Sequence, residues 1–296
     1  LFRSISIRGV KQQDFNAISK GPNAVYIDEG YVGINSIAAV GLFDIDHVEI
    51  LKGPQGTLFG RNATGGVLNI LTRDPSSTVG GYADYTYGSY NTNRIEAAIT
   101  GPLGSDQLTG RLAVLYDHNG AYVTNLAPTG GDLGGTDNWG IRGKIELKAT
   151  SNLDILLTGF LTRWTSSWGP YFSVPYTPVY AGTGPNRHQV DSVPATTSLL
   201  YPTNTSDPDS LTLNAHDAQS RGDFQKMEGG NAKISYDVAD WTFTSISDYK
   251  HFRSKLLLDD TALPVSLFNT DDNAEFQSVS EELRAYRDFH SWRLTS

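Results

Sequence analysis

Residues 44–72 read DIDHVEILKGPQGTLFGRNATGGVLNILT, and this stretch decides the fold of the first part of the chain. Val48 and Ile50 belong to one short strand pattern, and residues 67–70 belong to a second. Between and beside them stand five glycines that permit tight turns and positive φ, namely Gly53, Gly56, Gly60, Gly65 and Gly66. The stretch therefore predicts a compact, loop-rich α/β unit.

The glycine spacing can also be compared with a phosphate-binding loop. Such a loop requires Gly, four residues, Gly, Lys and Ser or Thr, and a long helix must follow it. Neither the order nor the helical pattern is present here, so the sequence does not favour phosphate binding.

From about residue 78 the chain repeats one theme, an alternation of apolar and polar residues. Residues 139–148 read WGIRGKIELK. Trp139, Ile141, Ile145 and Leu147 share one face of this segment, and Arg142, Lys144, Glu146 and Lys148 share the other. A period of two predicts a strand with one apolar and one charged face.

Nine such strand patterns follow one another, and the last is incomplete. They are residues 82–90, 94–101, 108–116, 139–148, 153–164, 230–236, 241–249, 278–286 and 291–295. Apart from a short first connection near Asn91, short connections alternate with long ones at 117–138, 165–227 and 250–275. Short periplasmic turns opposite long extracellular loops are typical of outer-membrane barrels.

A soluble β-sandwich also alternates in this way, so it is the main structural alternative. The predicted strands of about 8–11 residues are long enough to cross a bilayer at a tilt. Trp139, Trp164, Trp241 and Trp292 stand at strand ends, where a barrel carries aromatic girdles. These features together favour the membrane barrel.

Composition excludes several classes of protein. The net charge of −9 does not suit nucleic acid, and the absence of cysteine excludes disulfides and thiolate metal sites. The sequence contains no run of about 18 apolar residues, so it predicts no transmembrane helix. Because the chain begins without Met and stops inside a strand pattern, we expect a fragment cut at both ends.

The stretch 44–72 resembles the plug-domain signature of TonB-dependent receptors, E-x-L-R-G-P-x-x-x-x-Y-G followed by G-G-V-I-N-I-x-T. Three further segments resemble family motifs in the family's order: ISIRG at 5–9, VYIDEG at 25–30 and SEELR at 280–284. Lys52 replaces the usual Arg, Phe59 replaces Tyr, and Glu29 is an additional residue in the Asp-Gly turn.

The resemblance implies a small α/β plug domain followed by antiparallel transmembrane β-barrel strands. We expect the plug to occupy residues 1–74 without its N-terminus, and the first part of the barrel to occupy 78–296. About nine strands of a larger barrel would be present. The TonB box would lie outside this chain.

The resemblance also implies a function. The protein would be a non-enzymatic active transporter in the outer membrane of a Gram-negative bacterium, energised by TonB and monomeric at full length. Its expected cargo is a ferric siderophore, with cobalamin, haem or oligosaccharide as alternatives. It would need no cofactor or resident metal and would contact outer-membrane lipid but no nucleic acid.

The family pattern predicts three groups of site residues. Two apical plug loops, 11–20 and 31–37, would offer Gln12, Gln13, Phe15, Tyr31 and Asn35 to the ligand. A long extracellular loop would offer Trp168, Tyr171 and Tyr176. Polar contacts between plug and barrel would involve Lys52, Arg61, Glu282 and Arg284. For each loop, an ordinary surface loop is the alternative interpretation.

Two other classes of protein remain to be weighed. An enzyme has little support, because the six histidines are scattered and no H-E-x-x-H or G-x-S-x-G motif occurs. The acidic pairs Asp259-Asp260 and Asp271-Asp272 could bind Ca²⁺ or serve acid–base chemistry, although a solvated loop is preferred. A soluble or surface β-rich carbohydrate-binding or adhesion protein would use Trp168 and Tyr171 as a sugar platform.

Overall fold

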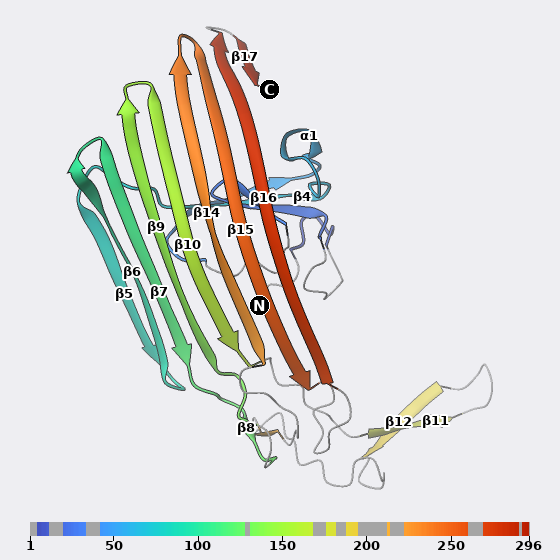
Figure 1. The fold of residues 1–296 in the computed structure, drawn as a ribbon. Helices are drawn as coiled ribbons and strands as arrows, with labels where there is room; N and C mark the ends of the chain where they lie inside the picture. The colour runs from blue at the N-terminus through green and yellow to red at the C-terminus, as the bar shows by residue number, and fades with distance from the viewer. Residues whose placement is uncertain are drawn as a thin grey trace.

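The structure is a computed structural model that describes most of the chain and contains two main sheets (Figure 1). It describes residues 5–11, 20–33, 42–127, 131–167, 176–181, 188–194, 212–213, 222–259, 269–289 and 292–295. A small sheet ends at Thr72, and a large curved sheet begins at Gly80. No helix in this part of the chain is long and apolar enough to cross a membrane.

The small sheet has four strands in the order β2-β1-β4-β3. Their bounds are β1 Asn23–Ile27, β2 Gly30–Val32, β3 Ile45–Lys52 and β4 Gly66–Thr72, and the short helix α1 covers Gly56–Phe59. The two strand patterns predicted around Val48 and Val67 are β3 and β4, which pair antiparallel. The glycine-rich segment between them forms α1 and its turns, as the sequence predicts.

The hairpin from β1 to β2 projects two acidic residues. Asp28 and Glu29 form its two-residue turn, with φ of +50° and +64°. Positive φ at both central positions is typical of a type I′ turn, whose twist matches that of the flanking strands. Glu29 is therefore the second residue of a tight turn.

The large sheet contains nine strands, all antiparallel, which confirms the predicted number and order. They are β5 Gly80–Gly88, β6 Thr92–Ser105, β7 Leu108–Asn119, β9 Thr136–Thr150, β10 Leu153–Ser166, β14 Asp223–Val238, β15 Trp241–Asp259, β16 Asn269–Phe289 and β17 Trp292–Thr295. Short turns join them at one end, and the longer connections lie at the other (Figure 1).

The predicted connections are shortened or structured in three places. β15 and β16 pair from Trp241 to Asp259, so the predicted loop 250–275 is largely strand. Asp259, Asp271 and Asp272 accordingly lie in strands, which corrects the loop assignment. Polar residues occupy both faces there, so the alternation that marks a strand disappears although the ladder continues.

The long 165–227 segment also contains regular structure. β11 Tyr176–Ala181 and β12 His188–Pro194 form a separate antiparallel hairpin. Thr212–Leu213 (β13) pairs with Thr124–Asn125 (β8). None of these strands joins the large sheet, but the ends of the segment do, because β10 extends to Ser166 and β14 begins at Asp223. The expectation that the segment stays out of a central sheet therefore holds only for the described residues between these ends.

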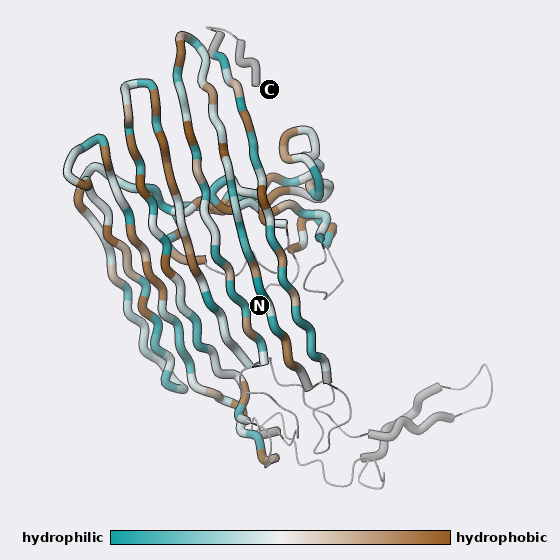
Figure 2. Tube along the Cα trace, in the orientation of Figure 1, coloured by the Kyte–Doolittle hydropathy of each residue, from teal (hydrophilic) through white to brown (hydrophobic). Residues whose placement is uncertain are grey.

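The two faces of the large sheet are inverted relative to a soluble protein. On β9, Trp139, Ile141 and Ile145 are 36%, 40% and 46% exposed, whereas Arg142 and Lys144 are 5% and 3% exposed. The small sheet lies on the charged side, and residues of opposite character alternate along the strands (Figure 2). A sandwich buries its apolar faces against each other, so this arrangement contradicts the soluble alternative.

One predicted girdle residue faces the other way. Trp164 packs against the cluster of the small sheet that contains Val25 and Ile70, so its assignment to an outer aromatic girdle is wrong. It shares its strand face with Phe160 and Thr162, which also point inward. Trp139 does point outward, and Trp241 stacks on Phe243. The side chain of Trp292 lies outside the described residues.

The outward face can be tested by introducing a charge. We expect Ile145→Arg to destabilise the full-length protein in detergent or vesicles by about 2–4 kcal/mol, the cost of a cation at the middle of a lipid-facing strand. Leu126→Arg is the matched control, because Leu126 is also exposed but lies in a connection. Equal effects of the two substitutions on the free energy of unfolding would contradict a lipid-facing surface.

Candidate functional site

The small sheet meets the concave side of the large sheet through a set of buried ion pairs and hydrogen bonds. The β1–β2 hairpin lies beside β15 and β16, and the segment that leads into β3 lies beside β6, β7 and β9. We name these two contacts the hairpin anchor, Asp28–Gly30, and the second anchor, residues 43–44.

Glu29 of the hairpin anchor pairs with two cations of the large sheet. Lys233 Nζ on β14 lies 2.5 Å from Glu29 Oε1, and Arg284 Nη1 on β16 donates to Glu29 Oε2. The carboxylate therefore accepts charged donors from two strands that are not adjacent. Hydrogen bonds between charged groups are shorter and stronger than neutral ones, so Glu29 ties the hairpin to both strands.

Asp28 connects the same turn to β9. Its carboxylate accepts the backbone N–H of Thr72 at 2.8 Å, and Lys144 Nζ lies 3.3 Å from Asp28 Oδ1. Lys144 Nζ also donates to Thr72 O at 3.0 Å and to Asp74 Oδ1 at 2.8 Å. A buried ammonium with three oxygen partners has its three donors satisfied, which offsets much of the cost of its burial.

Gly30 allows the hairpin to approach β15 closely. A Cβ on Gly30 would lie 2.2 Å from Asp248 Oδ2 and 2.4 Å from Asp248 Cγ. Asp248 is itself paired with Lys250, whose Nζ lies 2.5 and 2.6 Å from the two carboxylate oxygens. The family-like Asp-Glu-Gly turn thus needs its glycine because a buried ion pair of the barrel strand occupies the space of a side chain.

The second anchor is centred on Asp44. Arg111 Nε and Nη2 on β7 donate to its two carboxylate oxygens at 2.7 and 2.5 Å, which is a bidentate pair. Asp44 N donates to Glu96 Oε1 at 2.9 Å. Arg142 Nη1 donates to Phe43 O at 2.6 Å, and the Arg142 guanidinium lies 4.4 Å from the centre of the Phe43 ring.

Apolar residues also join the two sheets, so the contact is not made by polar side chains alone. Four buried side chains of the small sheet pack against five side chains of the large sheet. The first set is Val25, Ile27, Val32 and Ile70, and the second is Phe160, Trp164, Met227, Phe252 and Phe276. The inward strand faces are therefore charged in one part and aromatic in another, so both ion pairs and apolar packing hold the small sheet.

The anchors shift the ionisation of groups in the small sheet. Burial alone would raise the pKa of Glu29, but the hydrogen bonds and charges of Lys233 and Arg284 together lower it below its ordinary value. Burial raises the pKa of Tyr26 to about 12, and the negative charge of Glu282 contributes to the same direction. Glu29 is consequently held as a carboxylate well into acidic solution.

The predicted polar contacts fall into two groups. Arg284 contacts Glu29, and Glu282 accepts a hydrogen bond from Arg284 Nε at 2.7 Å. Lys52 is exposed and makes no ion pair within the described part of the chain. Arg61 lies over the ring of Tyr31 at 5.5 Å, so these two predicted residues meet each other inside the small-sheet unit.

The predicted ligand-binding residues are mostly beyond the part of the chain that the structure describes. Gln12, Gln13, Phe15 and Asn35 lie outside it, as do Trp168 and Tyr171. The backbone of Tyr176 begins β11 and pairs with Pro194. Tyr31 is described, and its hydroxyl accepts a hydrogen bond from Asn62 Nδ2 at 2.7 Å.

Sequence reasoning missed most acidic members of the two anchors. Asp28 and Glu29 stand in the VYIDEG motif, and Asp44 opens the decisive stretch, but nothing local indicates which cation each one meets. Arg111 and Lys233 lie on the inward faces of their strands, where the period-two pattern could have placed them. Among the described residues, no group of three or more His, Asp or Glu side chains could hold a metal ion.

An antiparallel sheet with an outward apolar face, curved around a separate small sheet that it binds through charges, defines a plugged outer-membrane β-barrel. The model of the TonB-dependent receptor plug domain matches residues 2–67. Residues 2–67 therefore belong to the TonB-dependent receptor plug-domain family, and the similar proteins reported next are receptors of the Gram-negative outer membrane.

Individual relatives agree with this family. The pesticin receptor of Yersinia enterocolitica serotype O:8 is 36% identical over 137 residues, which are 46% of this chain and 20% of the relative. The catecholate siderophore receptor Fiu of Escherichia coli O157:H7 is 26% identical over 275 residues, which are 83% of this chain and 34% of the relative.

A solved structure shows the same fold. The ferric yersiniabactin uptake receptor FyuA of Yersinia pestis superposes with a TM-score of 0.70 at 22% identity, over 97% of this chain and 39% of that one. The chain thus spans well under half the length of these proteins. From here on the small sheet and its loops are called the plug, and the large sheet the barrel wall.

The hairpin anchor predicts a pH dependence. Because the pKa of Glu29 is lowered in the plugged state, its contribution is complete above its ordinary value of 4.5 and is lost as the pH falls through the lowered value. We expect hydrogen-exchange protection factors of β1 and β2 to fall with acidification in the full-length protein. At neutral pH, Glu29→Gln should lower the free energy of opening that these protection factors report by about 1–3 kcal/mol, and it should weaken their pH dependence. Asp46→Asn, at an exposed plug residue, should behave like the wild type.

The second anchor predicts a larger cost. Asp44→Asn leaves the buried Arg111 guanidinium without its carboxylate, so we expect about 3–5 kcal/mol of destabilisation of the docked plug, measured by denaturant-dependent hydrogen exchange. In a double-mutant cycle, adding Arg111→Gln should recover part of this loss. If Asp44→Asn destabilises the docked plug no more than Glu29→Gln does, the Asp44–Arg111 ion pair contributes little. Strict additivity of the effects of Asp44→Asn and Arg111→Gln would show the same.

Proposed function

We propose that the full-length protein is an active transporter that takes up a ferric siderophore across the outer membrane with energy supplied through TonB. The names of the relatives support this cargo class, since they include a catecholate siderophore receptor and a ferric yersiniabactin uptake receptor. Cobalamin, haem and oligosaccharide remain the alternatives within the family. The proposed function is transport rather than an enzymatic reaction.

The observation that carries the proposal is the chemistry of the anchors. Lys144, Lys233, Arg284 and Arg111 bind carboxylates of the plug, so each contact can be exchanged for contacts with water when the plug moves. A buried ion pair adds little net stability compared with apolar packing, because desolvation opposes the Coulomb attraction. Such a contact suits a plug that must be held in register and yet released.

The transport cycle follows from this arrangement. A ligand would enter from the side of the long connections and contact the apical loops that contain Gln12, Gln13, Phe15 and Asn35. The Trp168, Tyr171 and Tyr176 segment would complete the site from the barrel. A pull on the plug would then break the hairpin anchor, whose Lys233 and Arg284 are about one-third exposed, before the more deeply buried Asp44 pair.

The proposed division of labour follows the two sheets. Residues 1–74 would act as the movable plug, and residues 78–296 would form the first part of the fixed barrel wall. Arg284 and Glu282 would serve as contacts between them, whereas Lys52 and Arg61 would act within the plug. The partners would be TonB and outer-membrane lipid, and the full-length protein would be a monomer.

An engineered disulfide tests plug movement. Gly30→Cys/Asp248→Cys places two sulfurs where the hairpin and β15 almost touch, and residues 1–296 contain no cysteine that could compete. We expect the oxidised full-length receptor to bind ferric siderophore but to lose uptake into cells. Reduction should restore uptake.

The single variants Gly30→Cys and Asp248→Cys are the controls, and each should transport equally with and without oxidant. Undiminished uptake by the cross-linked receptor would contradict a movable plug. If the reduced receptor binds no siderophore of any class offered, the proposal that its cargo is a ferric siderophore is contradicted.

A further inference from the structure

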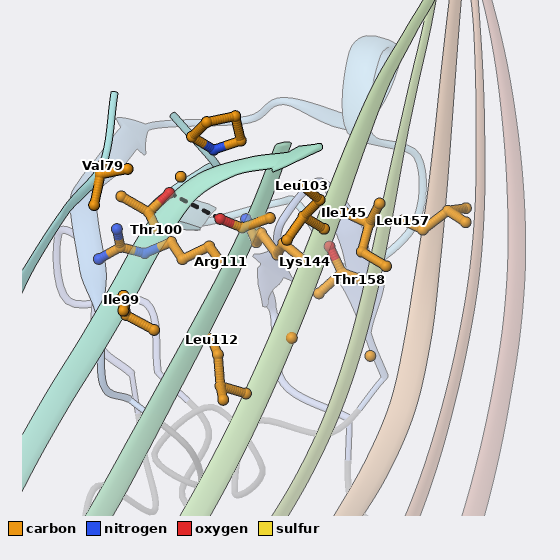
Figure 3. Close-up of a pocket in the computed structure, with 15 residues that line it drawn as sticks. Val79, Ile99, Thr100, Leu103, Arg111, Leu112, Lys144, Ile145, Leu157 and Thr158 are labelled. Atoms are coloured by element: carbon orange, nitrogen blue, oxygen red, sulfur yellow. Dashed lines mark hydrogen bonds between the residues drawn. The ribbon is translucent and has the colours of Figure 1, made fainter. Parts of the chain in front are cut away.

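The outward side of the barrel wall is not uniform, because it contains a groove of about 640 Å³ across β6, β7, β9 and β10 (Figure 3). Its walls are six exposed apolar side chains. They are Val79, Ile99, Leu103, Leu112, Ile145 and Leu157. Since these side chains lie on the face opposite the plug, the groove is separate from the plug–barrel contact.

Glycines form the floor of the groove. Gly143 and Gly159 are register partners on β9 and β10, and a Cβ on either would meet nothing within 4 Å. Gly101 and Gly110 are register partners on β6 and β7. The pair Gly143–Gly159 leaves the outer surface of the wall open by the depth of the missing side chains, and the pair Gly101–Gly110 lies one row further along the strands.

Two side chains from the ends of strands close the groove at one side. A Cβ on Gly110 would lie 2.8 Å from Leu103 Cδ1, and a Cβ on Gly101 would lie 3.1 Å from Val79 Cγ2. Leu103 comes from the irregular end of β6, where the pairing shifts between Pro102 and Ser105. The glycines therefore do more than reduce bulk, because they seat Leu103 and Val79 against the wall.

The groove offers no polar side chain to a partner. Four polar residues border it, namely Thr100, Arg111, Lys144 and Thr158. All four have buried side chains on the plug side of their strands, as alternation along a strand requires. Only their backbone contributes to the outward surface, and its hydrogen bonds are used in the sheet.

We propose that this groove is a binding site for an acyl chain of a phospholipid from the periplasmic leaflet. The outward face of an outer-membrane barrel contacts hydrocarbon, so the groove is a recess in an established lipid interface. It lies beside the two-residue turn between β6 and β7, and short turns of such barrels face the periplasm.

Packing favours an acyl chain as the occupant of the groove. An empty recess forfeits the dispersion contacts of its lining, and a flexible chain can fill an irregular apolar groove without ordering polar groups. Association between proteins within the membrane depends on close backbone packing and interhelical or side-chain hydrogen bonds, for which this groove has no donor or acceptor side chain. A protein segment is therefore the less suitable occupant.

Native mass spectrometry of the full-length receptor tests this site. The protein is released from vesicles of phosphatidylethanolamine and phosphatidylglycerol, and retained phospholipid is counted at an activation energy that removes loosely bound lipid. Gly143→Leu/Gly159→Leu fills the floor, and because a Cβ at either position would meet nothing within 4 Å, the barrel should fold. We expect retention of one phospholipid to fall by about tenfold, the loss expected when a few methylene contacts are removed.

Two further variants complete the experiment. Leu103→Ala removes one wall without adding bulk, and it should also lower retention. Val279→Phe adds apolar bulk to the same outward face on β16, three strands from Gly159, and it should retain lipid like the wild type.

Equal retention of phospholipid by the wild type and both groove variants would overturn the proposal. It would also be overturned if the groove variants selectively lost a lipid A adduct or a second copy of the chain. Siderophore uptake is scored separately, so a receptor that retains its lipid but transports nothing would contradict the proposed function and leave the groove assignment supported.

Discussion

The rest of the structure depends on one constraint: the charged faces of the barrel strands are buried, and they need partners. Arg142, Lys144 and Lys250 are almost fully enclosed, although they lie on a sheet whose other face is apolar. Isolated buried charges cost several kcal/mol each, so these cations are stable only with oxygen atoms close to them. The plug supplies many of those oxygens through the turn at Asp28–Gly30 and the segment around Asp44.

The same constraint explains why the outward face is apolar. A strand has two faces, and once the polar side chains point toward the plug, the remaining positions must face the surroundings. In water, such a surface of Ile, Leu, Val and Trp would promote aggregation. In a bilayer it is the stable surface, and the inner strands of the sheet pair their backbone groups with neighbours on both sides. Plug and membrane thus satisfy the two faces of each strand.

The sequence was most informative where period two persists. Nine strands, their order and the faces of β9 followed from alternation, because burial on one side and lipid on the other leave a regular signal. Trp164, Phe160 and Phe252 were not predictable in the same way. They are apolar residues on the inward face, and composition alone cannot distinguish contact with a plug from contact with lipid.

The anchors were only partly predictable for a different reason. Each one joins residues separated by tens to hundreds of positions, such as Glu29 with Arg284, so no local pattern contains the pair. The long β15–β16 ladder was missed because polar residues on both of its faces near Asp271 remove the alternation on which the assignment relied. The glycine floor at Gly143 and Gly159 requires the register between strands, which the sequence does not state.

A direct test of the inverted strand is collisional relaxation of spin labels placed one at a time at residues 139–147 of the membrane-inserted receptor. Accessibility should vary with a period of two. Labels at odd positions should be accessible to oxygen, which dissolves in lipid, and labels at even positions should be shielded from both oxygen and a water-soluble nickel complex. Even positions freely accessible to the nickel complex, or odd positions shielded from oxygen, would contradict a wall with lipid on one side and a charged plug contact on the other.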